Sequence, residues 1–415
     1  MANSETTPWE KVRLGQIARI SSGGTPSRNV SEYWNGAIPW ITTSKINFGV
    51  ISEADEFITE HGLKSSAAKV FTKGTLLMAM YGQGATRGRV GILGIDAAIN
   101  QACASIELED KTSSEFLFYF LAYNYEQIRK LGHGGNQANL NGELIRSIEI
   151  LLPPYKEQIG IATILRQWDR AISRTGTLIA AKVKRKRGLM QQLLTGKRRF
   201  PKFADRAWEE LKLSDVFERV TRKNNEGNTN VVTVSAQRGF VKQNEFFNRL
   251  VASENLDGYF LIKEGEFCYN KSYTNNYAWG ATKRLKGFEK AVVTTLYICF
   301  RVKDEASHSG DFLEQLFEAC LLDKGLTKIA HEGGRAHGLL NVTPSDFFNL
   351  VITIPSYDEQ VAIAQILQTA DREIDLLKKQ LDALKRQKRG LMQKLLTGQI
   401  RVKVDDFEAA AVEAS

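Results

Sequence analysis

The chain has 415 residues, 43% of them hydrophobic and 25% charged, which is the composition of a soluble globular protein with two or three domains. No apolar run approaches the length of a membrane span, and residues 1–10 lack the apolar core of a signal peptide, so we expect a cytoplasmic protein. The net charge of +9 favours a polyanionic partner.

A first globular block follows a short N-terminal tail and extends to about Leu152. It begins with Trp9-Glu-Lys-Val-Arg-Leu14 and ends with a Gly-Gly loop at 134–135 and a strand at 148–152. Apolar spacing predicts one amphipathic helix over 114–131. Short apolar runs between glycine turns predict further strands at 38–41, 76–81 and 90–93.

The next segment occurs twice, from Tyr155 to Gly196 and again, without a gap, from Tyr357 to Gly398. In each copy apolar residues step by four and three, the pattern of a coiled-coil helix, and Lys388 is the polar exception in the second. Prolines precede both copies and glycines end them. A helix of about 40 residues is about 60 Å long. Because a lone helix could not bury its apolar stripe, we expect the two to pack together. The alternative is that each serves only its own domain.

A second block, from the basic connector at 197–202 to the strand at 350–354, has the same beginning and end as the first. Trp208–Leu213 matches Trp9–Leu14, and a second Gly-Gly loop lies at 333–334. The middles of the two blocks differ. The sequence therefore predicts an α+β protein in which a globular block and a long helix each occur twice, followed by a frayed tail at 401–415.

Catalytic motifs are poorly represented. Leu152-Pro-Pro-Tyr155 approaches the [DN]PP[YF] motif of amino-methyltransferases, but Leu152 cannot accept the hydrogen bond that this chemistry needs. Gly82–Gly88 has the glycine content of a phosphate loop, but the strand-like run that follows favours a β-hairpin. The five histidines and four cysteines show no metal-ligand spacing, and we expect the cysteines to be reduced core thiols.

Binding chemistry is better represented, because polar, glycine-punctuated loops occupy corresponding places in the two blocks. Amides suit adenine edges, Arg and Lys suit guanine, and hydroxyls and lysines hold phosphates. The basic runs at 182–187, 197–199 and 385–389 either track phosphates or are solvated faces. The predicted DNA-binding residues are Trp40, Thr42, Thr43, Ser44, Lys45, Tyr81, Gln83, Thr86 and Arg87 in the first block, and Lys271, Ser272, Tyr273, Asn275, Asn276, Lys283 and Arg284 in the second, with Arg335 as backbone support.

The duplicated helices resemble those of the specificity (S) subunits of Type I restriction–modification enzymes. The resemblance rests on the helix starts at Pro153-Pro-Tyr155-Lys-Glu157-Gln158 and Pro355-Ser-Tyr357-Asp-Glu359-Gln360. It rests also on both endings, Lys-Arg-Gly-Leu-Met-Gln-x-Leu-Leu-Thr-Gly, on the block starts at Trp9 and Trp208, and on Ile38-Pro-Trp-Ile-Thr-Thr-Ser44.

The resemblance implies two target-recognition domains (1–152 and 198–354), each followed by a conserved spacer helix (153–197 and 355–400). It implies that the helices pack as an antiparallel coiled coil with an internal pseudo-two-fold repeat. Each domain would read half of an asymmetric bipartite site in double-stranded DNA. The helices would dock two methyltransferase (M) subunits, which use S-adenosylmethionine, and restriction (R) subunits would add ATP- and Mg-dependent cleavage. This chain would itself hold no cofactor, no metal and no catalytic residue.

Two other functions stay open at this point. A self-sufficient methyltransferase or nuclease would need a cofactor loop and a catalytic motif, and the sequence shows neither. A coiled-coil adaptor joining two protein-binding domains would fit the helices, but the basic charge and the polar loops favour DNA.

Overall fold

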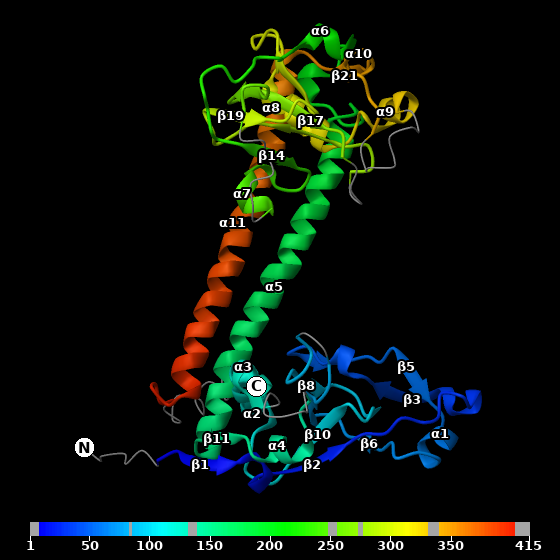
Figure 1. Cartoon of the computed structure of the whole chain (residues 1–415), viewed down its shortest axis with the longest axis vertical. Helices are drawn as coiled ribbons and strands as arrows, with labels where there is room; N and C mark the ends of the chain where they lie inside the picture. The colour runs from blue at the N-terminus through cyan, green and yellow to red at the C-terminus, as the bar shows by residue number, and fades with distance from the viewer. Residues whose placement is uncertain are drawn as a thin grey trace. The chain divides into compact units, whose positions relative to one another are not determined.

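The computed structural model describes residues 8–82, 85–131, 139–247, 255–272, 277–330 and 340–402. The chain forms two compact units, of which the first contains residues 1–176 and 380–415 and the second residues 177–379. Each unit therefore contains one globular block and a part of both long helices (Figure 1). The predicted α+β class is confirmed. Among the described residues, no helix is both long and apolar enough to cross a membrane.

In unit 1, a five-stranded sheet has the order β2-β10-β7-β8-β4 and a four-stranded sheet the order β5-β3-β9-β6, while β1 pairs with β11. The strands are β1 (Glu10–Arg13), β2 (Ala18–Ser22), β3 (Trp34–Ile41), β4 (Val50–Ile51), β5 (Glu56–Ile58), β6 (Val70–Phe71), β7 (Leu76–Ala79), β8 (Val90–Leu93), β9 (Ala97–Ile99), β10 (Cys103–Leu108) and β11 (Glu149–Leu152). The helices are α1 (Glu60–Lys64), α2 (Ser114–Tyr123), α3 (Tyr125–Leu131), α4 (Gly142–Arg146) and the start of α5 (Tyr155–Leu193), with short turns η1 (Leu14–Gln16), η2 (Ser31–Tyr33) and η3 (Thr43–Lys45).

In unit 2, a four-stranded sheet has the order β13-β20-β17-β18, and the remaining strands form the pairs β12-β21, β14-β15 and β16-β19. The strands are β12 (Glu209–Lys212), β13 (Phe217–Arg219), β14 (Val232–Ser235), β15 (Gly239–Lys242), β16 (Phe260–Lys263), β17 (Phe267–Asn270), β18 (Ala281–Arg284), β19 (Lys290–Val293), β20 (Ile298–Val302) and β21 (Val351–Ile354). The helices are α6 (Leu213–Val216), α7 (Gln243–Phe247), α8 (Gly310–Glu318), α9 (Asp323–Ile329), α10 (Pro344–Phe348) and the start of α11 (Tyr357–Leu396), with the turn η4 (Pro201–Phe203).

The single helix predicted over 114–131 is wrong, because the structure has two helices separated by Asn124. The Asn124 side chain donates a hydrogen bond to the carbonyl of Phe120 at 2.9 Å, which completes the last turn of α2. An asparagine that bonds to nearby backbone in this way favours a helix end over a helix interior. The periodicity of the apolar residues continues across this break, and the sequence pattern therefore concealed it.

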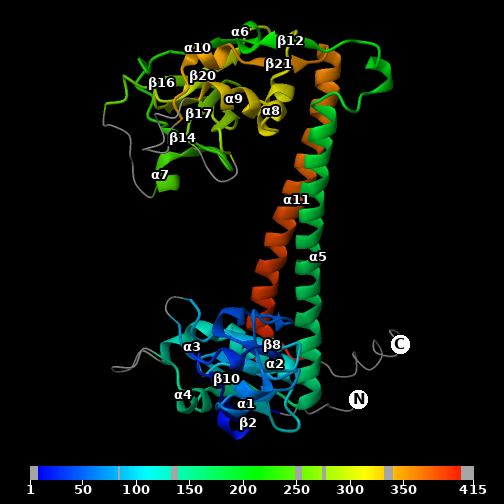
Figure 2. The same cartoon turned by 90° about the vertical axis from the view of Figure 1, so that its right-hand side faces the viewer.

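Segments of α5 and α11 lie side by side within each unit and run in opposite directions (Figures 1 and 2). In unit 1, Lys388 Nζ contacts Asp169 Oδ1 at 2.5 Å. In unit 2, Lys186 Nζ contacts Asp371 Oδ1 at 2.6 Å. The two contacts correspond residue for residue in the sequence repeat. Lys388, the polar exception in the apolar pattern of the second helix, thus has a specific ion-pair partner.

A buried carboxylate at the start of each long helix ties that helix to the segment beyond the end of the other. Glu157 accepts hydrogen bonds from Arg401 at 2.7 and 2.8 Å, from Trp9 Nε1 at 3.0 Å and from the backbone of Val402 at 3.1 Å. In unit 2, Arg199 donates to Glu359 at 2.7 and 3.1 Å. The two carboxylates occupy equivalent places in the repeat and so do the two arginines.

The backbone conformation at the end of each repeat explains why a glycine occurs there. Gly196 and Gly398 have φ angles of +67° and +73°, the left-handed conformation that glycine adopts after a helix without steric cost. A β-carbon at Gly398 would lie 3.6 Å from the ring of Trp9, and one at Gly196 would lie 3.5 Å from the ring of Trp208. The glycine therefore ends the helix and turns the chain so that the following arginine reaches its glutamate.

The glutamine after each glutamate joins the helix start to its own globular block. Gln158 accepts a hydrogen bond from the backbone of Ser113 at 2.8 Å and donates one to Pro153 at 2.8 Å. Gln360 bonds to Ser309 at 2.8 Å and to Pro355 at 2.9 Å. The repeated Glu-Gln pair is thus explained by two sets of buried contacts.

We predict that Glu157→Gln destabilises the chain by about 1–3 kcal/mol at pH 7, because a charged acceptor is lost from a buried arginine pair. Burial would raise the pKa of Glu157, but the hydrogen bonds from Arg401, Val402 and Trp9 outweigh it and hold this pKa below its ordinary value. The stabilisation is therefore present above about pH 4.3 and is lost as the pH falls through the lower folded-state pKa.

Denaturant unfolding of the full chain between pH 7 and pH 3 measures this difference. The gap between wild type and Glu157→Gln should close on acidification. The matched control is Glu149→Gln, whose partner Lys11 is exposed, and it should leave stability nearly unchanged. A gap that stays constant to pH 3 would contradict the role of the Glu157 carboxylate.

Candidate nucleic-acid interface

In unit 1, the end of β7 meets the segment around Leu140, and we call this meeting point the corner of the unit. The backbone amide of Leu140 donates to the carbonyl of Met80 at 3.0 Å, so the chain that follows the Gly-Gly loop returns to the end of this strand. A cleft of about 650 Å³ opens at this corner. Its lining comprises Ile20, Ser21, Ser22, Gly23, Ala67, Lys69, Met80, Tyr81, Gln101, Ala104, Asn141, Gly142 and Arg146.

The cleft combines an apolar floor with polar and aromatic walls. Ile20 and Met80 are buried in the core beneath it, and Tyr81 is 41% exposed at its edge. Gln101 carries both a donor and an acceptor, the pair of groups that reads an adenine edge. Its side-chain oxygen accepts a hydrogen bond from Thr25. Together these groups offer stacking, amide and apolar contacts in one place.

Sequence reasoning placed Tyr81 at this site but missed Lys69, Gln101, Asn141 and Arg146. These four residues come from separate turns and from α4, and only the fold brings them together. Asn141 also caps α4, since its side-chain oxygen accepts from the amide of Leu144 at 2.8 Å. No spacing in the sequence points to the group, although Asn141 lies close after the Gly-Gly loop.

The loop after Tyr81 connects β7 and β8, which pair antiparallel, so the predicted hairpin is confirmed. Thr86 is half-buried, whereas the Arg87 side chain is buried with 7% exposed. The loop packs on α3, where the hydroxyl of Tyr125 donates to the carbonyl of Ala85. Gln83 lies outside the described residues.

Trp40 and the segment after it do not line this cleft. The Trp40 indole is 3% exposed, packs in a small core with Ile58, and donates to the carbonyl of Gly24 at 2.9 Å. It supports the fold from the interior, and whether it contacts DNA stays a prediction.

The turn that follows Trp40 is partly accessible. Ser44 is exposed and its hydroxyl lies 2.7 Å from that of Thr42. Thr43 is half-buried at the start of η3. The Lys45 ammonium contacts Asp55 at 2.5 Å and Glu53 at 3.4 Å, so its charge is already paired. These four residues form a polar surface separate from the cleft lining.

The corresponding corner of unit 2 lies at the end of β17. There the amide of Leu340 donates to the carbonyl of Lys271 at 3.0 Å, the same backbone bond as between Leu140 and Met80. Ser272 follows, and its amide donates to the side chain of Asn270 at 3.0 Å. The structure thus brings Lys271 and Ser272 to the place that Met80 and Tyr81 occupy in unit 1. Tyr273, Asn275, Asn276 and Arg335 lie outside the described residues.

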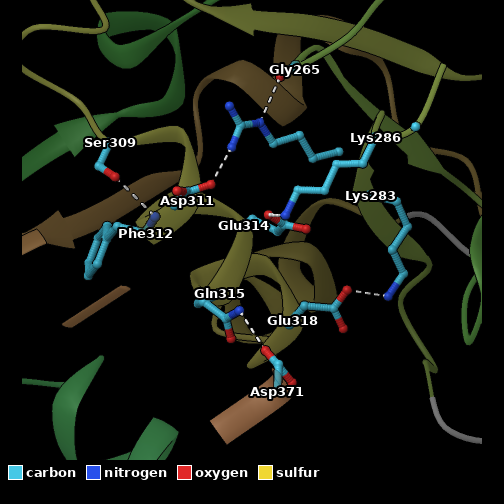
Figure 3. A network of polar contacts seen from close by, with 12 residues as sticks. Gly265, Lys283, Lys286, Ser309, Asp311, Phe312, Glu314, Gln315, Glu318 and Asp371 are labelled. Atoms are coloured by element: carbon cyan, nitrogen blue, oxygen red, sulfur yellow. Dashed lines mark hydrogen bonds and ion pairs between the residues drawn. The ribbon is translucent and has the colours of Figure 1, made fainter. Parts of the chain in front are cut away.

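Lys283 belongs to a different, structural network (Figure 3), and the contacts of Arg284 place it in the same network. Lys283 on β18 is 7% exposed and pairs with Glu318 of α8. Arg284 contacts Asp311 at 2.7 Å and donates to the carbonyl of Gly265 at 3.1 Å.

These two cations attach α8 to the sheet, and their charges are neutralised there. Their sequence neighbours in the loops made them resemble DNA contacts. The fold instead uses them as internal ion pairs.

We predict that Lys283→Met destabilises the chain by about 1–3 kcal/mol, because it leaves the Glu318 carboxylate without its buried cation. Thermal or denaturant unfolding of the full chain measures the loss. Lys378→Met removes an exposed partner of Asp375 on α11 and should leave stability nearly unchanged. Equal stability of Lys283→Met and wild type would show that the α8–β18 network is dispensable.

Among the described residues, no group of three or more His, Cys, Asp or Glu side chains could hold a metal ion. Each unit instead presents an edge where polar loops border a strand end.

The comparisons with known proteins agree with this geometry. Residues 6–183 and 205–386 match the model of the Type I restriction modification DNA specificity domain. The MjaIX specificity subunit of Methanocaldococcus jannaschii is 31% identical over 169 residues, which cover 40% of this chain and only 38% of that protein. The MjaVIII specificity subunit of the same organism is 23% identical over 432 residues, covering 96% of this chain and 94% of that protein.

The fold is similar to two solved structures. The S subunit of a Type I restriction–modification system from M. genitalium gives a TM-score of 0.56 with 16% identity, covering 95% of this chain and 98% of that one. A chain from a structural study of complex assembly in the type I system gives 0.53 with 15% identity, covering 94% and 98%.

Two such domains in one chain define a DNA-recognition subunit and not an enzyme. The chain belongs to the family of Type I restriction–modification specificity subunits.

Proposed function

We propose that this chain reads an asymmetric bipartite site in double-stranded DNA, one half with each unit. The observation that carries the proposal is the pair of equivalent corners, built on the same backbone bond but lined by different side chains. Tyr81 stands where unit 2 has Ser272, and Met80 where it has Lys271. A duplicated frame with unlike surfaces suits two unlike half-sites.

The proposed DNA contacts follow from accessibility. In unit 1 they are Tyr81 and Gln101 in the cleft and Thr86 in the loop between β7 and β8. Thr42, Thr43, Ser44 and Lys45, on the separate polar surface, are proposed to contact DNA phosphates. In unit 2 they are Lys271 and Ser272, followed along the chain by Tyr273, Asn275 and Asn276. Two further residues are retained from the sequence, Gln83 in the first block and Arg335 in the second. Trp40, Lys283, Arg284 and Arg87 act from the interior.

We further propose that α5 and α11 pack as an antiparallel coiled coil along their whole length, with a pseudo-two-fold axis between the repeats. The reciprocal contacts support this, because Asp169–Lys388 and Asp371–Lys186 exchange under the repeat, as do Glu157–Arg401 and Glu359–Arg199. In this account the spacer helices (153–197 and 355–400) set the distance between the recognition domains (1–152 and 198–354). Half-site spacing must match such a distance.

The partners follow from the same account. Two M subunits dock on the conserved helices and methylate adenine, and R subunits join for cleavage. S-adenosylmethionine binds to the M partner, ATP and Mg²⁺ bind to the R partner, and this chain needs none of them itself. The complex works in the cytoplasm.

We predict that the chain, purified with its M partner, selects two unlike short motifs at fixed spacing from a pool of random duplexes. Gln101→Ala should relax the preference at one position of one motif by about 1–3 kcal/mol and leave the other motif unchanged. Gln127→Ala, an exposed glutamine of α3 outside the cleft lining, is the matched control. A wild-type complex that selects no sequence, or only one motif, would refute the bipartite reader.

A further inference from the structure

The strand registers of the two units allow their corners to be compared residue by residue. In unit 1, Ile106 lies opposite both Ile20 and Leu76. In unit 2, Phe300 lies opposite both Arg219 and Phe267. Arg219 therefore occupies the position of Ile20.

The position of Lys271 follows in the same way. Leu76 and Phe267 are equivalent, and Met80 and Lys271 each lie four residues further along. The shared backbone bond to Leu140 and to Leu340 fixes this match, since the registers alone would also allow Phe300 to be aligned with Ala104 or Ser105. Lys271 therefore occupies the position of Met80.

Both substitutions exchange an apolar side chain for a cation. Ile20 and Met80 are 6% and 5% exposed and belong to the core of unit 1, under the cleft. Arg219 is exposed and Lys271 is half-buried. Because alternate residues of a strand share a face, Arg219 follows the core residue Phe217 on its face of the sheet. The face that is a hydrophobic floor in unit 1 thus ends in two positive charges in unit 2.

The two cations act on each other unfavourably. Burial lowers the pKa of Lys271, and the nearby Arg219 guanidinium lowers it further. Within the part of the chain that the structure describes, neither cation has an acidic partner. Other cations of unit 2 do have one, namely Arg222 with Glu266, Lys283 with Glu318, Arg284 with Asp311, Lys286 with Glu314, Lys290 with Glu226 and Arg301 with Glu218.

We propose that Arg219 and Lys271 together hold a backbone phosphate of the DNA in the second half-site. A shared anion relieves their repulsion, and a phosphate oxygen can accept from both at once. The position suits this task, because Lys271 lies at the strand end of unit 2 that corresponds to the cleft corner of unit 1. At the two equivalent positions unit 1 has the apolar Ile20 and Met80, and its cleft cations, Lys69 and Arg146, come from other positions. The inference rests on the proposed function and adds to it that the two half-sites are held by different chemistry.

The test compares Arg219→Gln and Lys271→Gln with wild type, each purified with the M partner. Affinity for the selected duplex is measured as a function of salt concentration, together with the selected motif. Each variant should bind more weakly and lose about 0.9 from the slope of log K against log salt, while the motif stays unchanged. Arg301→Gln, whose charge is already neutralised by exposed Glu218, is the control and should keep the wild-type slope.

Two results would contradict the proposed phosphate contact. A wild-type slope in both variants would overturn the phosphate anchor and leave the bipartite reader intact, provided that the wild-type complex still selects two motifs. A changed base preference at one position would also overturn it, in favour of direct reading of guanine by one of the cations. If Arg219→Gln fails to fold, Arg219→Lys, which keeps the charge, should restore both folding and slope, and Lys271→Arg should do the same for Lys271→Gln. A wild-type complex without sequence selection would remove the function on which the inference rests.

Discussion

The structure depends on a buried carboxylate at the start of each long helix. Glu157 and Glu359 are 3% and 0% exposed, and each accepts charged hydrogen bonds from an arginine far away in sequence. A buried charge is costly unless it is paired and fully bonded, so these carboxylates tolerate only one arrangement of the segments around them. In unit 1 the bond joins the first part of the chain to residues beyond the end of α11, and a compact unit forms from two separate segments.

The rest of the fold varies around this fixed frame. In both units the first strand pairs with the last, at β1–β11 and β12–β21, and a glutamine fastens the helix to its block. Within the described ranges, the strand-end corners at Met80 and Lys271 are not fixed by a buried ion pair of this kind. A position that is methionine in one unit is lysine in the other without any change in the backbone bond that it makes. The side chains at this strand end can therefore change while the frame of each unit stays the same.

The sequence predicted the two long helices, but it did not predict which side chains meet at the strand-end corners. The two helices were predictable because an apolar period of four and three persists over many turns and repeats later in the chain. The ion pairs of Lys283 and Arg284 with α8 were not predicted, because such contacts leave no local trace in the sequence. Gln101 was not singled out because only the fold brings it beside Tyr81. Trp40 was expected at the DNA, but its ring fills a core. Such placements depend on long-range contacts, which residue type and spacing do not encode.

In the proposed function, this chain alone decides which DNA sequence its complex modifies. The most direct test maps adenine methylation across the genome of the native host with and without this gene. The account predicts one two-part asymmetric motif, with unlike halves and a fixed spacer, that is methylated in the parent, lost on deletion and restored when the gene is returned. A methylation pattern that is identical in the two strains would contradict it.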